Sequence, residues 1–157
     1  MKPLSTVASA VAPSSTLAID ALFKQMKADG IDVVGFGAGE PDFPTPEHIK
    51  QAAVRAIAEN KTKYTAASGT VELKEAICRR MKADYDLDYE PANVFTSSGA
   101  KHVVYLALCA LLNPGDEVIL PAPFWVSYIE MVRLAGGVPV VVETTEEEHF
   151  KLSPEKL

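Results

Sequence analysis

The sequence has few of the residues and runs that mark several common protein classes. Its 157 residues include two cysteines, Cys78 and Cys109, and three histidines, none of them clustered. Two separate cysteines predict neither a disulfide framework nor a metal site, and they are typical of a protein of the reducing cytoplasm. No apolar run reaches the roughly 20 residues that a membrane-spanning helix needs. Residues 1–15 carry one lysine in a weakly apolar stretch broken by Ser, Thr and Pro, so we interpret them as an arm and not as a secretory signal.

Positive charge is also scarce. The chain has 15 Lys and Arg against 21 Asp and Glu, a formal net charge of −6, and no basic cluster. This balance argues against nucleic acid or an anionic membrane as a partner. At 48% hydrophobic and 23% charged residues the composition is that of a globular protein, and the length is enough for one domain with a core.

The first 45 residues predict one helix, one short strand and a shaped loop. Apolar residues at helical spacing predict a helix over 15–29, which Ser14 or Ser15 can cap and Gly30 ends. A short strand is predicted over 32–34. The stretch 35–46 has too many glycines and prolines for regular structure, so it is predicted to be a loop.

Two more helices are predicted before the middle of the chain. The run Thr45-Pro46-Glu47 is typical of a helix start, with Thr45 as the N-cap, proline at the first position and an acid in the first turn. A further helix is predicted to begin near Thr70, after a loop over 62–69.

From residue 94 onward the pattern becomes strand, helix, strand, helix, strand. The strands are continuous apolar runs, which are typical of a parallel sheet covered by helices on both faces. The sequence therefore predicts an α/β fold with three layers, helix, sheet and helix. The expected strands are 94–96, 118–120 and 138–142, and the expected helices are 100–112 and 125–135.

Two of the turns that end strands carry residues suited to a ligand. Ser97 to Lys101 places small residues and a lysine at a helix start, where backbone N–H groups and the helix dipole favour a phosphate. An ordinary turn between a strand and a helix explains the same residues. Trp125 follows the next strand and could stack on a flat ring at the carboxyl edge of the sheet, but a tryptophan buried in the core is the simpler reading.

Two other motif matches fail on context. Gly35, Gly37 and Gly39 resemble a dinucleotide fingerprint, but the third glycine of that motif would stand at Glu40, and the following prolines exclude the required helix. Ser98 to Lys101 also matches the Ser-x-x-Lys motif of penicillin-binding proteins, whose companion motifs are missing from the sequence.

Five groups of residues in chain order have one family resemblance in common. They are Gly39-Glu40-Pro41-Asp42-Phe43-x-Thr45-Pro46, Lys63-Tyr64 with Gly69, Ser98-Gly99-Ala100-Lys101, Asn113-Pro114-Gly115-Asp116-Glu117-Val118, and Pro123-Phe124-Trp125-Val126-Ser127-Tyr128. With these motifs the whole chain resembles the N-terminal part of a fold-type-I, pyridoxal-phosphate-dependent aminotransferase. The class I subgroup that includes bacterial aspartate aminotransferases matches best.

The resemblance implies a domain division and a fragment. Residues 1–45 would be the N-terminal arm and a small-domain segment, and 46–157 the incomplete N-terminal part of the large domain that binds the cofactor. The Schiff-base lysine of the family lies beyond the region matched here, and none of the eleven lysines stands in its context. We therefore expect this chain to be an inactive fragment of a homodimeric enzyme. Because its sheet would be incomplete, we also expect exposed apolar surface and self-association.

The resemblance also implies roles for individual residues. Gly39 would contact the substrate carboxylate, and the N–H groups of Gly99, Ala100 and Lys101 would hold the cofactor phosphate. Trp125 would lie against the cofactor ring and border the substrate. Tyr64 would reach across a dimer interface to the cofactor phosphate of the neighbouring subunit. The proline matching Pro123 can be cis in the family, so a cis Ala122–Pro123 bond is predicted. No residue of the chain is expected to be catalytic by itself.

The implied activity is transfer of an amino group from an amino acid, aspartate, to a 2-oxo acid with pyridoxal 5′-phosphate. Two alternatives stay open at this point. One is an aminotransferase of another specificity, aromatic or of the diaminopimelate type. The other is a natural non-catalytic domain that binds a phosphorylated ligand or a partner subunit.

Overall fold

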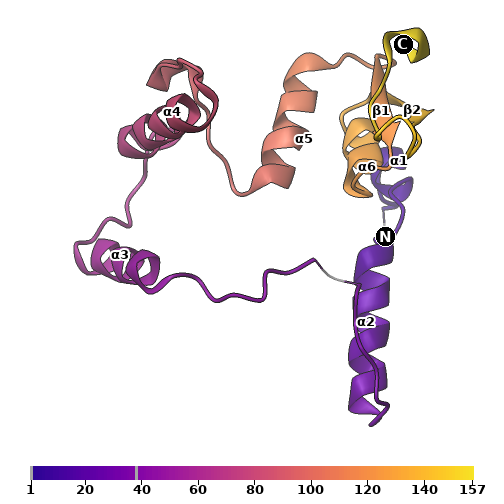
Figure 1. Ribbon diagram of the computed structural model, residues 1–157, viewed down its shortest axis with the longest axis horizontal. Coiled ribbons are helices and arrows are strands. Elements are labelled where there is room, and N and C mark those ends of the chain that lie inside the picture. The colour runs from indigo at the N-terminus through magenta and orange to yellow at the C-terminus, as the bar shows by residue number, and fades with distance from the viewer. Residues whose placement is uncertain (1, 38) are drawn as a thin grey trace. The chain divides into compact units, whose positions relative to one another are not determined.

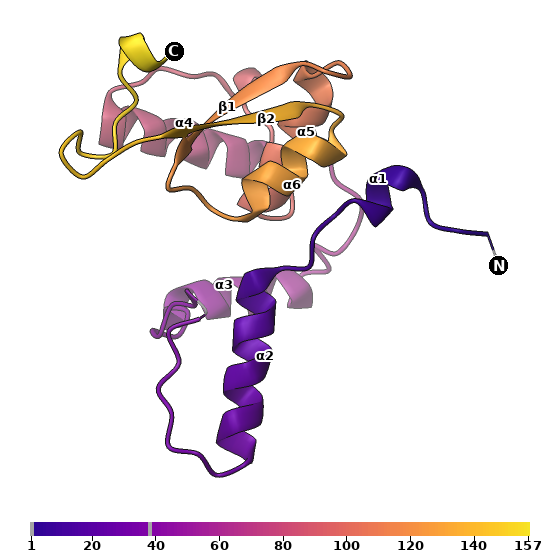
Figure 2. The same cartoon turned by 90° about the vertical axis from the view of Figure 1, so that its right-hand side faces the viewer.

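The computed structural model describes residues 2–37 and 39–157, which form two compact units. Of the described residues, 2–37 and 98–157 form one unit, and 39–97 form the other. Figures 1 and 2 give two views of the elements. Residue 1 of the predicted arm and residue 38 of the predicted loop lie outside the described residues. The units are defined by contacts within this chain, so the domain boundary at 45–46 stays a prediction.

The N-terminal part of the first unit is helical. The short helix α1 spans Thr6–Ser9, and α2 spans Ser15–Ala28 with the Ser14 hydroxyl accepting from the N–H of Leu17 at 3.4 Å. This confirms the predicted first helix and its cap.

The predicted strand over 32–34 is wrong. Those residues have no strand structure, and no neighbouring strand is paired with them in the described chain. The segment that follows lies against α2 instead: a Cβ atom at Gly35 would lie 2.8 Å from the Phe23 ring, and one at Gly37 would lie 2.6 Å from Cγ2 of Ile19. The chain after this run therefore packs closely on α2, while Val34 of the run itself is 74% exposed.

The centre of the first unit is a β-α-β element. Strand β1 (Glu117–Ala122), helix α6 (Ser127–Leu134) and strand β2 (Val138–Glu143) follow one another, and the two strands are parallel with Glu117 opposite Val138 and Ala122 opposite Glu143. The predicted parallel pairing and the predicted strands over 118–120 and 138–142 are confirmed. The helix begins two residues later than predicted, because Trp125 and Val126 belong to the turn.

The core of this unit lies between α6 and the strands. Val132 on α6 is 1% exposed, and Met131 and Leu120 are also buried. Gly137 allows the chain to turn closely past α6: a Cβ there would lie 3.1 Å from Cγ1 of Val132 and 2.8 Å from Cδ1 of Leu112. The buried contacts are therefore on one side of the strand pair.

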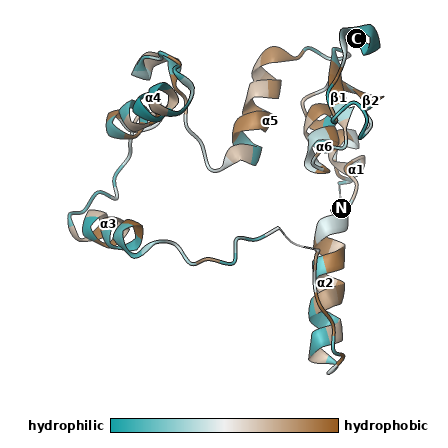
Figure 3. Cartoon of the chain, viewed as in Figure 1, coloured by the Kyte–Doolittle hydropathy of each residue, from teal (hydrophilic) through white to brown (hydrophobic). Residues whose placement is uncertain are grey.

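The expectation that both faces of the strands are buried is wrong for this chain. Ile119 and Val141 are 41% and 44% exposed, because the sheet of the described residues has two strands only. Helix α5 (Ala100–Leu111) is as apolar as predicted and packs against α6, yet Leu111 is exposed. Figure 3 shows the apolar residues along α5 and on the two strands. The predicted exposed apolar surface is present, and self-association stays a prediction.

The second unit contains the helices α3 (Glu47–Ala58) and α4 (Val71–Tyr85) and the short 3-10 helix η1 (Pro91–Asn93). Helix α4 begins next to Thr70 as predicted, and the Thr70 hydroxyl caps it by accepting from the N–H of Leu73 at 3.3 Å. Thr45 is not the cap of α3: Pro46 occupies that position, and no side chain caps it.

The expected strand over 94–96 is also absent from the second unit. The N–H of Thr96 donates to the carbonyl of Ser68 at 3.0 Å, so its backbone is satisfied by a loop and not by a strand. Near the end of the chain, Ser153 precedes the 3-10 helix η2 (Pro154–Lys156). Among the helices of the described residues, none is both long and apolar enough to cross a bilayer.

Candidate functional site

Helix α5 begins with backbone groups that no side chain caps. Its N-cap is Gly99, at φ 84° and ψ 160°, in the left-handed half of φ space that favours glycine. The Gly99 carbonyl accepts from the N–H of Val103 at 3.2 Å, while no side chain bonds at the cap position. A Cβ atom at Gly99 would meet nothing within 4 Å, so the space beside this turn is open. The N–H groups of Ala100 and Lys101 at the start of α5 therefore face the end of the helix that favours an anion.

The turn between β1 and α6 supplies the aromatic residue. The Ala122–Pro123 bond is cis, as predicted. Trp125 follows two residues later, is 50% exposed, and accepts from the N–H of Tyr128 at 3.0 Å where α6 begins. The expectation of a tryptophan wholly buried in the core therefore does not hold.

A cavity of about 150 Å³ brings the two turns together within the first unit. Three of the predicted site residues, Ala100, Lys101 and Trp125, line it. Val104, Tyr128 and Met131 complete the lining, so its walls are apolar on the side of the two helices. Lys101 also lines a second cavity of about 360 Å³, which residues 11–15 of the arm close against α6.

Two of the predicted residues, Tyr64 and Gly39, belong to the second unit. Tyr64 is wholly exposed there, at 107% of its reference area. A Cβ atom at Gly39 would likewise meet nothing within 4 Å. The roles predicted for Tyr64 with the phosphate and for Gly39 with the substrate carboxylate stay predictions.

The residues of the smaller cavity fit a phosphorylated aromatic ligand. Uncapped N–H groups and the Lys101 ammonium favour a dianion at the start of α5. The half-exposed indole of Trp125 offers a flat face to a ring. By contrast, the described part of the chain contains no group of three or more His, Cys, Asp or Glu side chains that could hold a metal. The arrangement therefore places a helix start that favours an anion beside an aromatic side chain, and the titratable side chains that line the cavity are Lys101 and Tyr128.

One residue that contacts the turn of Trp125 at its start, Thr144, was not predicted from the sequence. Thr144, just after β2, donates its hydroxyl and its N–H to the carbonyl of Ala122, the last residue of β1. The signal in the sequence was a threonine directly behind an apolar strand. The sequence does not show that the Thr144 hydroxyl bonds to the Ala122 carbonyl, because this bond depends on the register that places Ala122 opposite Glu143.

Comparison with known protein families identifies one match. A family model described as aminotransferase class I and II matches residues 31–157. A Geobacillus stearothermophilus protein named aspartate aminotransferase is 55% identical over 157 residues, which cover 100% of this chain and 40% of that protein. A Cereibacter sphaeroides protein named aspartate/prephenate aminotransferase is 53% identical over 154 residues, covering 98% of this chain and 38% of that protein.

A solved structure agrees with the fold. The Thermus thermophilus aspartate aminotransferase, solved with maleate, superposes with a TM-score of 0.94 at 46% sequence identity, covering 99% of this chain and 41% of that one. The chain thus spans about two fifths of the length of the relatives that it matches. The α/β fold expected from the sequence is therefore confirmed as part of a larger known fold.

Proposed function

Because the chain belongs to the aminotransferase class I and II family, we propose that it forms the N-terminal part of a pyridoxal-phosphate-dependent aminotransferase. The proposed reaction moves the amino group of an amino acid, aspartate, to a 2-oxo acid. The relatives named aspartate aminotransferase support this donor. The observation that carries the proposal is the cavity shared by Ala100, Lys101 and Trp125.

In this proposal the start of α5 binds the cofactor phosphate. The N–H groups of Gly99, Ala100 and Lys101 point to the end of the helix where the dipole favours negative charge, and a phosphate carries close to two negative charges. Gly99 leaves that end open because it has no side chain. Lys101 adds a positive charge beside the same cavity.

Trp125 is proposed to hold the ring and to exclude water from one of its faces. Its position at the carboxyl end of β1 is where ligands of open α/β sheets bind. When bound, pyridoxal phosphate supplies an electron-withdrawing ring that stabilises negative charge on the amino acid. Gly39 is proposed to receive the substrate carboxylate through its backbone, which has no side chain in the way.

We further propose a homodimer in which Tyr64 serves the neighbouring subunit. The phenol is wholly exposed in this chain, which suits a side chain that reaches a second molecule. The extensive exposed apolar surface supports association as well. We place the enzyme in the cytoplasm, in keeping with two free cysteines.

None of the eleven lysines is proposed to react with the cofactor, because Lys101 belongs to the phosphate turn and the others have no family context. Transaminases need such a lysine. The 157-residue chain alone is therefore expected to be inactive.

The test assays two proteins: the 157-residue chain, and the product of the whole reading frame that encodes it. Aspartate is the donor, with 2-oxoglutarate and then prephenate as acceptors, since one relative is named for prephenate. The proposal predicts turnover by the reading-frame product and none by the chain. Turnover by the purified chain would contradict the proposal that Lys101 serves only the phosphate turn and that no lysine of the chain reacts with the cofactor. A reading frame that ends at Leu157, with an inactive product, would favour the non-catalytic domain. Preference for an aromatic donor would favour the aminotransferase of another specificity.

A further inference from the structure

Thr144 makes two hydrogen bonds to one atom. Its N–H donates to the carbonyl oxygen of Ala122 at 3.2 Å, which continues the ladder between β1 and β2 by one rung. Its hydroxyl donates to the same oxygen. Any residue except proline could supply the first bond, but the second needs a side-chain hydroxyl close to the backbone, as in serine or threonine. The side chain therefore adds a specific connection to the end of β1.

Burial makes this connection obligatory for the hydroxyl. Thr144 is 8% exposed, and it is the one polar residue that is buried among the residues the structure describes. A buried hydroxyl without a partner costs free energy, so a buried one is almost always bonded. The Ala122 carbonyl serves as that partner. The bond thus fixes the threonine rotamer and the position of the Ala122 carbonyl together.

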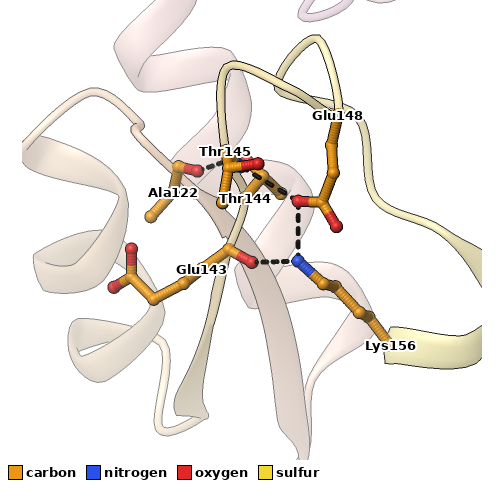
Figure 4. Close-up of polar contacts among 6 residues, drawn as sticks. All are labelled: Ala122, Glu143, Thr144, Thr145, Glu148 and Lys156. Carbon is orange, nitrogen blue, oxygen red and sulfur yellow. Dashed lines mark hydrogen bonds and ion pairs between the residues drawn. The ribbon is translucent and has the colours of Figure 1, made fainter.

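An outer set of contacts fixes the backbone on both sides of Thr144. Figure 4 shows that Lys156 donates to the Glu143 carbonyl at 2.9 Å and to Oε2 of Glu148 at 2.7 Å. The same Glu148 oxygen accepts from the N–H of Thr145 at 3.0 Å. The ammonium of Lys156 also lowers the pKa of Glu148, the largest cause of that shift. The residues on both sides of Thr144 are therefore held by Glu148, which bonds to Thr145, and by Lys156 of η2, which bonds to Glu143.

On the other side, Ala122 leads directly into the turn that carries Trp125. That turn is fixed at its far end where the N–H of Tyr128 donates to the Trp125 carbonyl at 3.0 Å. Only Pro123 and Phe124 separate Ala122 from Trp125. The short turn that carries Trp125 is therefore held at one end through the Ala122 carbonyl and at the other end through the Trp125 carbonyl.

We propose that Thr144 is a positioning residue of the cofactor site, which holds Trp125 in place through its hydroxyl bond to the Ala122 carbonyl. The proposal rests on the proposed function for its link to the cofactor. Thr144 does not line the cavity and would touch neither cofactor nor substrate. It would act by keeping the indole face aligned with the ring.

The first test uses Trp125 as its own probe, since it is the single tryptophan. Acrylamide quenching of its fluorescence is compared in the wild type, Thr144→Val and Thr144→Ser. Because Trp125 is already 50% exposed, full release would at most about double the quenching constant. Thr144→Val is expected to raise the constant toward that limit, and Thr144→Ser to restore the wild-type value because it keeps the hydroxyl. Equal constants in all three proteins would overturn the proposal.

A matched control separates positioning from general loosening. Thr96→Val also removes a hydroxyl that donates to a carbonyl, that of Ser68 at 3.2 Å, but in the unit without tryptophan. It is expected to leave quenching unchanged, and an increase equal to that of Thr144→Val would count against a specific role. If Thr144→Val does not fold, Lys156→Met takes its place. Loss of the outer contacts should raise quenching, and a wild-type value would overturn the proposal.

The second test separates the inference from the function. Pyridoxamine 5′-phosphate is titrated into the wild type and Thr144→Val, because this ligand has no aldehyde to react with lysines. The expected result is saturable quenching in both, with a dissociation constant raised at least threefold in the variant. Binding that is the same in both would overturn the inference and leave the function standing. No saturable binding to the wild type, with altered acrylamide quenching in Thr144→Val, would refute the function and leave the positioning of Trp125 standing.

Discussion

Replacing Val132 by alanine tests whether the core of the first unit lies where α6 meets the strands. The side chain is 1% exposed and is the largest that is fully buried among the described residues. Its Cγ1 would lie 3.1 Å from a Cβ placed on Gly137, and its carbonyl accepts from the N–H of Gly137 at 2.9 Å. The site is therefore packed from the side of the turn between α6 and β2.

The expected loss of stability follows from the two carbons removed. Each buried methylene or methyl group contributes about 0.8 kcal/mol by transfer, or about 1.6 kcal/mol for two. Incomplete collapse of the cavity raises the cost to about 2–3 kcal/mol. Val138→Ala is the matched control, because Val138 is 45% exposed in the same unit. Its expected cost is below about 1 kcal/mol.

The assay is urea unfolding followed by Trp125 fluorescence, at concentrations where the midpoint does not depend on protein concentration. Gly137→Ala is measured in both backgrounds. Its new methyl group would press on Val132 Cγ1 and on Leu112 Cδ1, 2.8 Å away, so it should cost less free energy when Val132 is alanine. Equal costs for Val132→Ala and Val138→Ala, or additive costs in the double variant, would refute this account of the core.

Three further predictions concern other parts of the chain. Gly69→Ala should destabilise the second unit by more than about 2 kcal/mol in urea unfolding followed by circular dichroism, because the φ of Gly69 is 102° and a Cβ atom there would lie 2.1 Å from Oγ1 of Thr96. The control is Gly115→Ala, which should cost about 1 kcal/mol because Gly115 has a φ of 92° but open space around it. Equal costs for the two variants would contradict the argument. Lys156 holds the pKa of Glu148 below its ordinary value, so Lys156→Met should raise that pKa in an NMR titration. A carboxyl whose folded pKa is depressed stabilises the fold above its unfolded pKa, and this stabilisation is lost as pH falls through the folded pKa. The loss should be smaller in the variant, where only the bonds from Thr145 still lower the pKa of Glu148. The exposed apolar surface should make the chain self-associate in size-exclusion chromatography with light scattering, and a monodisperse monomer would contradict this.

The sequence predicted the elements whose signals are local. The helix start near Thr70, the helix end before Gly30 and the β-α-β run from β1 to β2 follow from local signals and from continuous apolar runs, and all are present. The two turns that form the smaller cavity could also be named, because each follows a predicted strand and precedes a helix.

The failures are non-local. An apolar run such as 32–34 forms a strand only if another strand pairs with it, and here the chain that follows it packs on α2. The run 94–96 likewise bonds to the loop at Ser68. Thr144 could not be selected from the sequence because its hydroxyl gains its partner only from the register of β1 and β2. In each case the sequence does not show which distant part of the chain lies against the residue in question.

The most direct test of the central claim compares pyridoxamine 5′-phosphate with pyridoxamine as ligands of the 157-residue chain. Both present the same ring to Trp125, and they differ in the phosphate that the start of α5 is proposed to hold. Charge-assisted hydrogen bonds contribute about 1.5–3 kcal/mol, so the phosphorylated ligand should bind at least about tenfold more tightly by saturable quenching of Trp125. Lys101→Gln should reduce that preference and leave the affinity for pyridoxamine unchanged. Equal affinities of the wild type for the two ligands would contradict the assignment of this cavity to a phosphorylated cofactor.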